Sequence, residues 1–233
     1  GGFIAEPIQG AGGVIVPPPT YFEKIQPILK KYDILFIADE VITGFGRTSN
    51  MFGSTTYGLK PNSISVAKAI TSAYAPLGAV LIDEDMNQAL IDESKKIGTF
   101  GHGFTYSGHP LSCAVALKTL EIYERDDIVG KVRKTSPIFL KRLQGLTNHP
   151  LIGEANGVGL IGGVEIVADK KSKKQYDPKK GVAAKAVSFA QEEGLIVRPL
   201  MGDRVAFCPP LVITRDQAAF ALDTLEECLL AAA

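Results

Sequence analysis

Short runs of mostly apolar residues recur along the first half of the chain. They span residues 3–8, 34–38, 63–67 and 78–82, and the runs 34–38 and 78–82 contain no polar residue. An apolar run without polar alternation is typical of a strand in a parallel sheet that helices cover on both faces. The pattern therefore predicts an α/β layer whose polar residues stand at the strand ends.

Helical periodicity separates these runs and continues after them. Apolar residues recur at helical spacing over 21–32, and Thr20 followed by Glu23 predicts a capping box at the start of that helix. Further helices are expected over residues 86–95, 111–124, 128–143 and 182–193, and a last helix is expected to begin at a second capping box, Thr214 with Gln217. Residues 98–109 are rich in glycine and histidine, and they predict an irregular loop.

The second half of the chain mixes strands and helices. Strands are expected over residues 162–167 and 195–198, with a polar segment rich in Lys and Asp over 169–180. The pattern G-x-G-x-x-G at residues 157–162 fits a dinucleotide fingerprint, but that fingerprint needs a helix after it, and here a strand-like run follows. We interpret these glycines as a turn.

Charge and hydropathy narrow the classes of function. The 233 residues carry 25 Lys and Arg against 25 Asp and Glu, a formal net charge of +0. Nucleic acid and anionic membrane both require a concentrated basic face, so neither is expected as a partner. The apolar runs are far shorter than the roughly 20 residues of a membrane-spanning helix, and no signal-peptide pattern opens the chain. We expect a cytoplasmic protein that acts on small molecules.

Neither disulfides nor metal binding are expected. Cys113, Cys208 and Cys228 are an odd number, widely spread and without metal-ligand spacing, so they are interpreted as small apolar residues. His102 and His109 have no third ligand at suitable spacing, and they are expected to shape the loop that contains them.

Two charged residues follow predicted strands directly. Asp39 comes after the run 34–38, and Lys68 comes after the run 63–67. Ligands of α/β sheets bind beyond the carboxyl ends of the strands, where helix N-termini also point their donors. Burial would favour the neutral, nucleophilic amine of Lys68. Taken alone, the two residues equally fit a turn former and a solvated surface charge.

Four motifs give these residues a context. They are AEPIQGAGG at 5–13, ADEVITGFGRT at 38–48, AK at 67–68 followed by APLGA at 75–79, and FTYSGHP at 104–110. Together, and in this order, they resemble the successive signatures of class III aminotransferases. The segments GLIVR at 194–198 and AFCPPL at 206–211 resemble the omega-transaminase branch, which acts on amines, β-amino acids or amino acids with pyruvate.

The resemblance implies the fold, the cofactor and the assembly. The implied fold is α/β, the PLP-dependent transferase fold type I. Residues 1–115 would be the carboxyl-terminal part of the large domain with its mainly parallel sheet, and residues 116–233 would be an α+β small domain. Pyridoxal 5'-phosphate (PLP) is the implied cofactor. The implied partners are an amino donor and a keto acid, in a homodimer that shares each site across its interface.

The resemblance also implies roles for individual residues. Lys68 would bind PLP covalently and move a proton at the substrate carbon, while Asp39 would keep the pyridine nitrogen protonated. Val41 would pack against the ring, Thr105 would donate to the phosphate from the neighbouring subunit, and Glu6 would support the site beside Asp39.

Arg198 is the implied substrate residue, because a guanidinium suits a carboxylate through a bidentate pair. Without the resemblance, a surface arginine paired with Asp203 or Glu193 is the simpler interpretation. Arg47 is left open between a phosphate ligand and an ion-pair partner of Asp39 or Glu40.

Two other functions stay open. An aminomutase or a decarboxylase of the same fold would use the same electron sink, and a noncatalytic fragment would only dimerise. The Gly-Ser phosphate loop and the ring-stacking aromatic residue of the family would precede Glu6, and neither is present in the sequence. The chain is therefore expected to correspond to the carboxyl-terminal half of such an enzyme.

Overall fold

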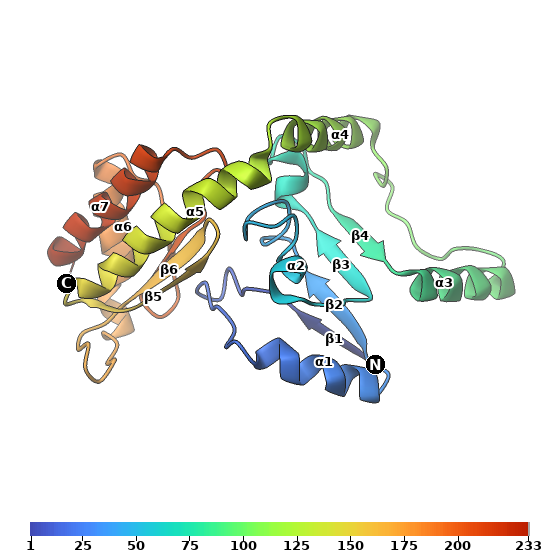
Figure 1. The fold of residues 1–233 in the computed structure, drawn as a ribbon, viewed down its shortest axis with the longest axis horizontal. Helices are drawn as coiled ribbons and strands as arrows, with labels where there is room; N and C mark the ends of the chain where they lie inside the picture. Colours follow the sequence, from blue (N-terminus) through green and yellow to red (C-terminus); the bar gives the residue numbers. More distant parts are fainter. Residues whose placement is uncertain (233) are drawn as a thin grey trace. The chain divides into compact units, whose positions relative to one another are not determined.

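The computed structural model describes residues 1–232, and these form two compact units. The first unit contains residues 1–7, 18–45 and 52–127. The second unit contains residues 8–17, 46–51 and the chain from Ile128 onward. Each unit has its own sheet (Figure 1).

The first unit is built on a four-stranded sheet in the order β1-β2-β3-β4. Its strands are β1 (Gly2–Ala5), β2 (Leu35–Asp39), β3 (Ser63–Val66) and β4 (Ala79–Ile82). β1, β2 and β3 are parallel, whereas β4 runs antiparallel to β3. The mainly parallel sheet predicted from the apolar runs is confirmed.

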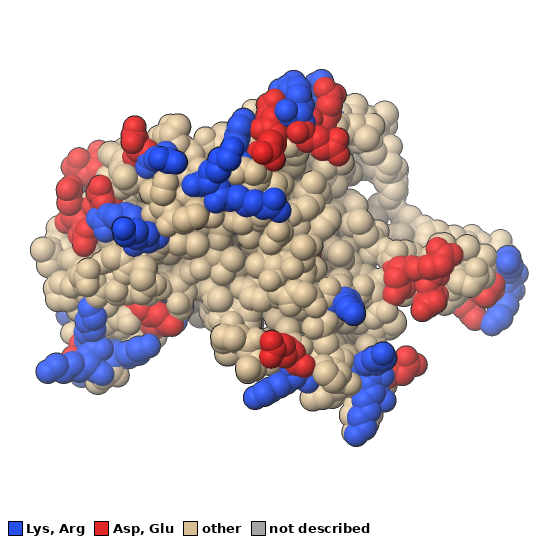
Figure 2. Space-filling view, viewed as in Figure 1, with Lys and Arg blue, Asp and Glu red and all other residues tan. Residues whose placement is uncertain are grey.

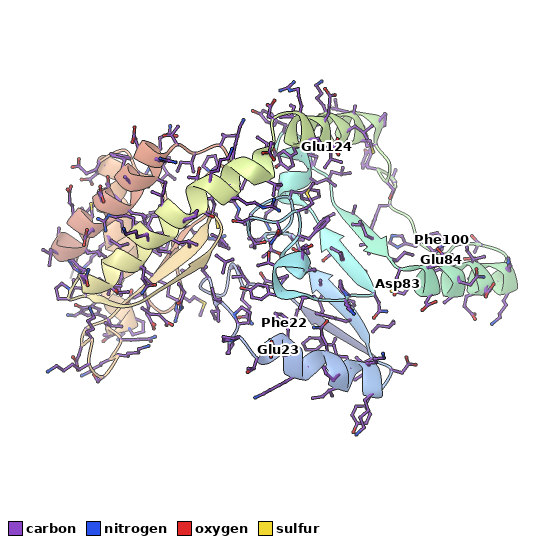
Figure 3. All side chains as sticks on the ribbon, viewed as in Figure 1. Phe22, Glu23, Asp83, Glu84, Phe100 and Glu124 are labelled. Carbon is purple, nitrogen blue, oxygen red and sulfur yellow. The ribbon has the colours of Figure 1, made fainter. Side chains whose placement is uncertain are left out.

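Helix α1 (Tyr21–Lys31) covers one face of this sheet (Figure 1). Phe22 points from α1 toward the strands, and it packs in a small core with Leu29, Phe36 and Leu59 (Figure 3). The capping box predicted for this helix is wrong, because Thr20 has helical backbone angles and makes no capping bond within the described residues. A residue in that conformation does not adopt the extended geometry that a capping side chain needs.

The remaining helices of the first unit are the short α2 (Gly53–Tyr57), α3 (Glu84–Ile97) and α4 (Pro110–Arg125). Residues 68–71 form the 3₁₀ turn η1 (Lys68–Thr71). All four residues of β4 are exposed, and the described part of α3 buries no residue. The prediction that the run 78–82 is a covered strand is therefore wrong, since an apolar run does not say whether both faces are packed.

The second unit is an antiparallel sheet in the order β5-β6-β8-β7. Its strands are β5 (Ile152–Val158), β6 (Ile161–Ile166), β7 (Arg198–Leu200) and β8 (Arg204–Phe207), and its helices are α5 (Ile128–Gly145), α6 (Val182–Glu192) and α7 (Arg215–Ala232). The 3₁₀ turns η2 (Leu146–Asn148) and η3 (Pro178–Lys180) complete it. Phe139, Val164, Leu222 and Leu225 belong to its core, which confirms the α+β interpretation.

The capping box predicted at the last helix is present. The Thr214 amide donates to Gln217 Oε1 at 3.0 Å, and the Gln217 amide donates to Thr214 Oγ1 at 3.2 Å. These reciprocal bonds satisfy two backbone donors at the start of α7.

Basic and acidic side chains occur in mixed groups on the face of the molecule shown in Figure 2. None of the helices described in residues 1–232 has both the length and the apolar character needed to cross a membrane.

Candidate functional site

Asp39 lies at the carboxyl end of β2, where it pairs in register with Ser65 of β3. The backbone amide of Val41 donates a hydrogen bond to Asp39 Oδ1 at 3.0 Å. This bond leaves the second carboxylate oxygen for another partner and holds the side chain in one orientation. Val41 itself is half-buried beside it.

Lys68 follows β3 after a single residue, Ala67, and begins the turn η1. Since β2 and β3 are parallel neighbours, Asp39 and Lys68 emerge at the same edge of the sheet. The Lys68 backbone has φ of 48°, in the left-handed region. A long side chain in that region is uncommon, and such residues gather at functional sites.

A hollow of about 390 Å³ lies beside this turn, and we call it the Lys68 hollow. It is lined by Lys68, Thr71 and residues 73–77. All of these residues belong to the first unit. Lys68 therefore borders an open hollow at the carboxyl end of β3.

Glu40 is the residue of this site that the sequence analysis missed. Its carboxylate is fully buried at the end of β2. Oε2 accepts from the Gly53 amide at 2.8 Å and from Thr43 Oγ1, and Oε1 accepts from the amide and the hydroxyl of Ser54 at 2.5 and 2.6 Å. Gly53 and Ser54 begin α2, so Glu40 caps that helix from a distant part of the chain.

Glu6 belongs to the same edge of the sheet. It follows β1, whose Ala5 pairs with Ala38 of β2, so Glu6 leaves the sheet next to Asp39. A Cβ atom added to Gly53 would lie only 2.9 Å from the Cβ atom of Pro7. The start of α2 therefore packs against the segment that carries Glu6.

Glu40 was missed because it lies 13 residues before the Gly53-Ser54 pair that it caps, and such a spacing produces no periodic pattern in a sequence.

Thr105 lies in the irregular segment 98–109, which confirms the loop predicted there. The hydrogen bonds described for this segment are local, for example from the Phe104 amide to Ser107 Oγ at 3.1 Å. Thr105 is exposed, and among the described residues none of these bonds joins it to Lys68 or Asp39. Figure 3 shows Phe100 of the same segment beside α3.

Arg198 belongs to the second unit. It begins β7 and does not end a strand over 195–198 as predicted, because only Arg198, Pro199 and Leu200 pair with β8. Its side chain is exposed, and within residues 1–232 no ion pair with Asp203 or Glu193 is found. The Asp203 side chain instead accepts from the Ala183 amide at 3.1 Å.

Other candidate residues of the sequence have structural roles. Arg47 donates to the carbonyl oxygens of Leu160 and Pro209 at 2.9 and 2.5 Å, all within the second unit. Gly159, with φ of +63°, lies in the tight turn between β5 and β6, and Gly157 and Gly162 pair with each other beside it, so the interpretation as a turn is confirmed. Among residues 1–232 no group of three potential ligands is placed to hold a metal ion.

Lys68 and Asp39 follow neighbouring parallel strands, and a hollow lies beside Lys68. Ligands of α/β sheets bind beyond such strand ends. The sequence profile of the family described as Aminotransferase class-III matches residues 1–229. The chain belongs to the class III aminotransferase family, with the fold type I architecture of its first sheet.

Individual relatives agree. The chloroplastic gamma aminobutyrate transaminase 3 of Solanum lycopersicum is 49% identical over 92% of this chain and 41% of its own length. An uncharacterized aminotransferase of Sinorhizobium fredii is 47% identical over 93% of this chain and 47% of its own length. The chain therefore spans less than half the length of these curated relatives.

Solved structures give the same result. A transaminase described with L-alanine superposes with a TM-score of 0.95 at 51% identity, covering 99% of this chain and 54% of that one. The aminotransferase of Vibrio fluvialis, described in its PMP-bound form, superposes with a TM-score of 0.96 at 42% identity, covering 99% and 51%.

Proposed function

We propose that this chain carries the catalytic lysine of a PLP-dependent aminotransferase, which moves an amino group between an amine or amino acid and a keto acid such as pyruvate. One observation carries the proposal: Lys68, which lines the Lys68 hollow, and Asp39, whose carboxylate is held by the Val41 amide, emerge at one edge of the sheet. The relation to the class III family supports it.

The residues present fit PLP. The Lys68 amine borders the hollow, and Asp39 keeps one carboxylate oxygen that Val41 does not use, which suits a protonated ring nitrogen. Val41 would contact the ring, Thr105 would donate to the phosphate, and Glu6 would stand beside Asp39. PLP supplies, when bound, an aldehyde that captures amines and a ring that accepts electrons.

The chain's own residues then have separate tasks. Lys68 Nζ would hold the cofactor and, once released, take a proton from the substrate Cα and deliver it to the C4' carbon of the cofactor. Asp39 would hold the positive charge of the ring nitrogen with a charge-assisted hydrogen bond. Glu40 would keep the Asp39 segment fixed while the proton moves, because its carboxylate joins β2 to α2.

Arg198 would bind the carboxylate of the keto acid. Its exposed guanidinium, without a described ion pair, supports this assignment. Replacing Arg198 by Ala should weaken the half-reaction with pyruvate or alanine by about 2–4 kcal/mol in kcat/KM. The half-reaction of an amine donor without a carboxylate should stay near its original rate, and equal losses on both would contradict the assignment.

The names of the relatives suggest which amino donors to test first. Several of them are named as gamma-aminobutyrate transaminases, and one solved relative is described with L-alanine. We therefore propose γ-aminobutyrate and L-alanine as the first donors to test.

We further propose a homodimer in which Thr105 serves the partner's site. The exposure of the segment 98–109 and the absence of buried residues in α3 support this, since both would be covered in a dimer. The domain assignment stays a proposal too, with residues 1–115 as part of the large domain and 116–233 as the small domain.

A cytoplasmic location also stays a proposal. Within residues 1–232 no disulfide joins Cys113, Cys208 or Cys228, which is typical of a reducing compartment. Some relatives are named mitochondrial or chloroplastic. Cell fractionation tests the proposal: recovery in the cytosol would support it, and recovery in an organelle would contradict it.

The test of the function uses the complete polypeptide as it occurs in the cell, loaded with PLP. Adding the donor should convert PLP to pyridoxamine phosphate, and adding pyruvate should reverse the change. The Lys68→Ala variant should still bind PLP through its other contacts but should not complete either conversion. Release of carbon dioxide, or a rearranged amine without pyridoxamine phosphate, would instead indicate the decarboxylase or the aminomutase.

A further inference from the structure

The turn that contains Lys68 has an unusual backbone. Lys68, Ser72 and Ala73 all have left-handed angles, with φ of 48°, 48° and 64°. Each such residue costs about 1 kcal/mol or more when it is not glycine, so the surrounding structure must hold the turn in place. The contacts around the turn identify what holds it.

Tyr123 of α4 reaches this turn with its hydroxyl group. The hydroxyl donates to the Ala69 carbonyl at 3.1 Å and lies 3.3 Å from Ser72 Oγ. Since the single hydrogen of the Tyr123 hydroxyl is used by Ala69, the Ser72 hydroxyl is the donor of the second bond. One side chain thus joins both ends of the turn to α4.

The Tyr123 ring is itself fixed. It is buried, and its centre lies 6.4 Å from that of the buried Phe45. A bond from Thr71 Oγ1 to the Ala75 carbonyl at 2.6 Å closes the turn on its own far side. Tyr123 is the side chain that connects the turn to another element through these hydrogen bonds.

We propose that Tyr123 is a positioning residue for Lys68: its hydroxyl holds the turn in the left-handed conformation from which the Lys68 amine faces the Lys68 hollow. This inference rests on the proposed function, because the amine matters only if it bonds to PLP. The amine and the PLP aldehyde condense with loss of one water, so the step needs no oxidant or reductant.

Tyr123→Phe removes the hydroxyl and keeps the ring. Tyr57→Phe is the matched control, because the buried Tyr57 hydroxyl has no hydrogen-bond partner among the described residues. Ser72→Ala is a second variant, at an exposed position, and it removes the other hydroxyl of the pair. The first readout is amide hydrogen exchange of residues 69–74 without PLP, which should speed up about fivefold in Tyr123→Phe and stay unchanged in Tyr57→Phe.

The second readout is the rate at which PLP becomes covalently attached to Lys68, followed by absorbance. Tyr123→Phe should slow it about fivefold or more, Ser72→Ala by less, and Tyr57→Phe not at all. Unchanged attachment in Tyr123→Phe would overturn the inference and leave the proposed function intact, as would an equal slowing in both phenylalanine variants. A wild-type protein that never attaches PLP to Lys68 would overturn the proposed function itself and the inference with it.

Discussion

Glu40 shows at the scale of one residue how the site edge is held together. Its buried carboxylate accepts from two backbone amides and two hydroxyl groups. Buried charge is costly unless hydrogen bonds compensate it, and here four donors do so.

We predict that Glu40→Gln lowers the free energy of unfolding by about 2–3 kcal/mol, because the new amide group faces donors that need an acceptor. Glu23→Gln, at an exposed position of α1, is the control and should change it by a few tenths, about 0.3 kcal/mol. Urea unfolding of both variants measures this, and equal stabilities would show that the Glu40 bonds contribute nothing.

His149 gives the protein a pH-sensitive position. Burial lowers the pKa of its imidazole, the nearby Lys170 lowers it further, and Glu226 partly offsets both. Its Nδ1 accepts from the Leu151 amide at 3.2 Å, and its buried Nε2 has no partner within the described residues.

Because the folded pKa is below that of the unfolded chain, the unfolded chain binds a proton in the window between the two values. Stability is thus expected to fall as the pH drops below the ordinary histidine value of about 6.5 and through the folded pKa. His149→Asn keeps an acceptor for Leu151 but cannot titrate, so it should flatten this part of the curve of melting temperature against pH. If melting temperature depended on pH in the same way in the variant, His149 would not be the cause. His102 and His109 are exposed, unlike the buried His149.

At the scale of elements, two helices with the same predicted capping pattern begin differently in the structure. The spacing of Thr20 and Glu23 equals that of Thr214 and Gln217, yet only the second pair forms its hydrogen bonds. The two pairs differ because Thr20 has helical backbone angles, which a capping residue does not have. The capping pattern also takes no account of the three prolines, residues 17–19, that precede Thr20.

Thr214→Ala should therefore cost about 1 kcal/mol of stability, whereas Thr20→Ala should cost little. Thermal unfolding of the two variants side by side measures the difference. No loss in Thr214→Ala would mean that the Thr214 bonds are not formed in solution, and an equal loss in Thr20→Ala would mean that Thr20 also caps its helix.

The positions of β2, β3 and β4 were predicted well, but the burial of β4 was not. β2 and β3 follow their apolar runs, and so place Asp39 and Lys68 at one edge. The run that becomes β4 is also apolar but is exposed, because coverage depends on contacts between distant segments. Glu40 and Tyr123 went unnoticed for a related reason, since their partners are far away in the sequence.

At the scale of the whole molecule, the units recur in family members that are about twice as long as the chain. Residues 52–127 belong to the first unit, so α4 and its Tyr123 group with the strands that carry Lys68. The sequence alone could not assign α4 to this unit, because an amphipathic pattern shows that one face of a helix is buried but not against which element it packs.

The proposed sharing of sites predicts a recovery of activity on mixing two inactive variants. Lys68→Ala lacks the amine, and Thr105→Glu repels the phosphate. If Thr105 serves the partner's site, each mixed dimer has one intact site and one doubly altered site. Random exchange of subunits should then restore about one quarter of the sites. No recovery in demonstrably mixed dimers would place Thr105 in the site of its own subunit.

The covalent attachment of PLP tests the central claim most directly. The protein is loaded with PLP, treated with borohydride to fix the link by hydride addition, digested and mapped by mass spectrometry. The account predicts one major adduct, on the peptide that contains Lys68, and its loss in Lys68→Ala. An adduct spread over other lysines, or one that persists in Lys68→Ala, would contradict the account.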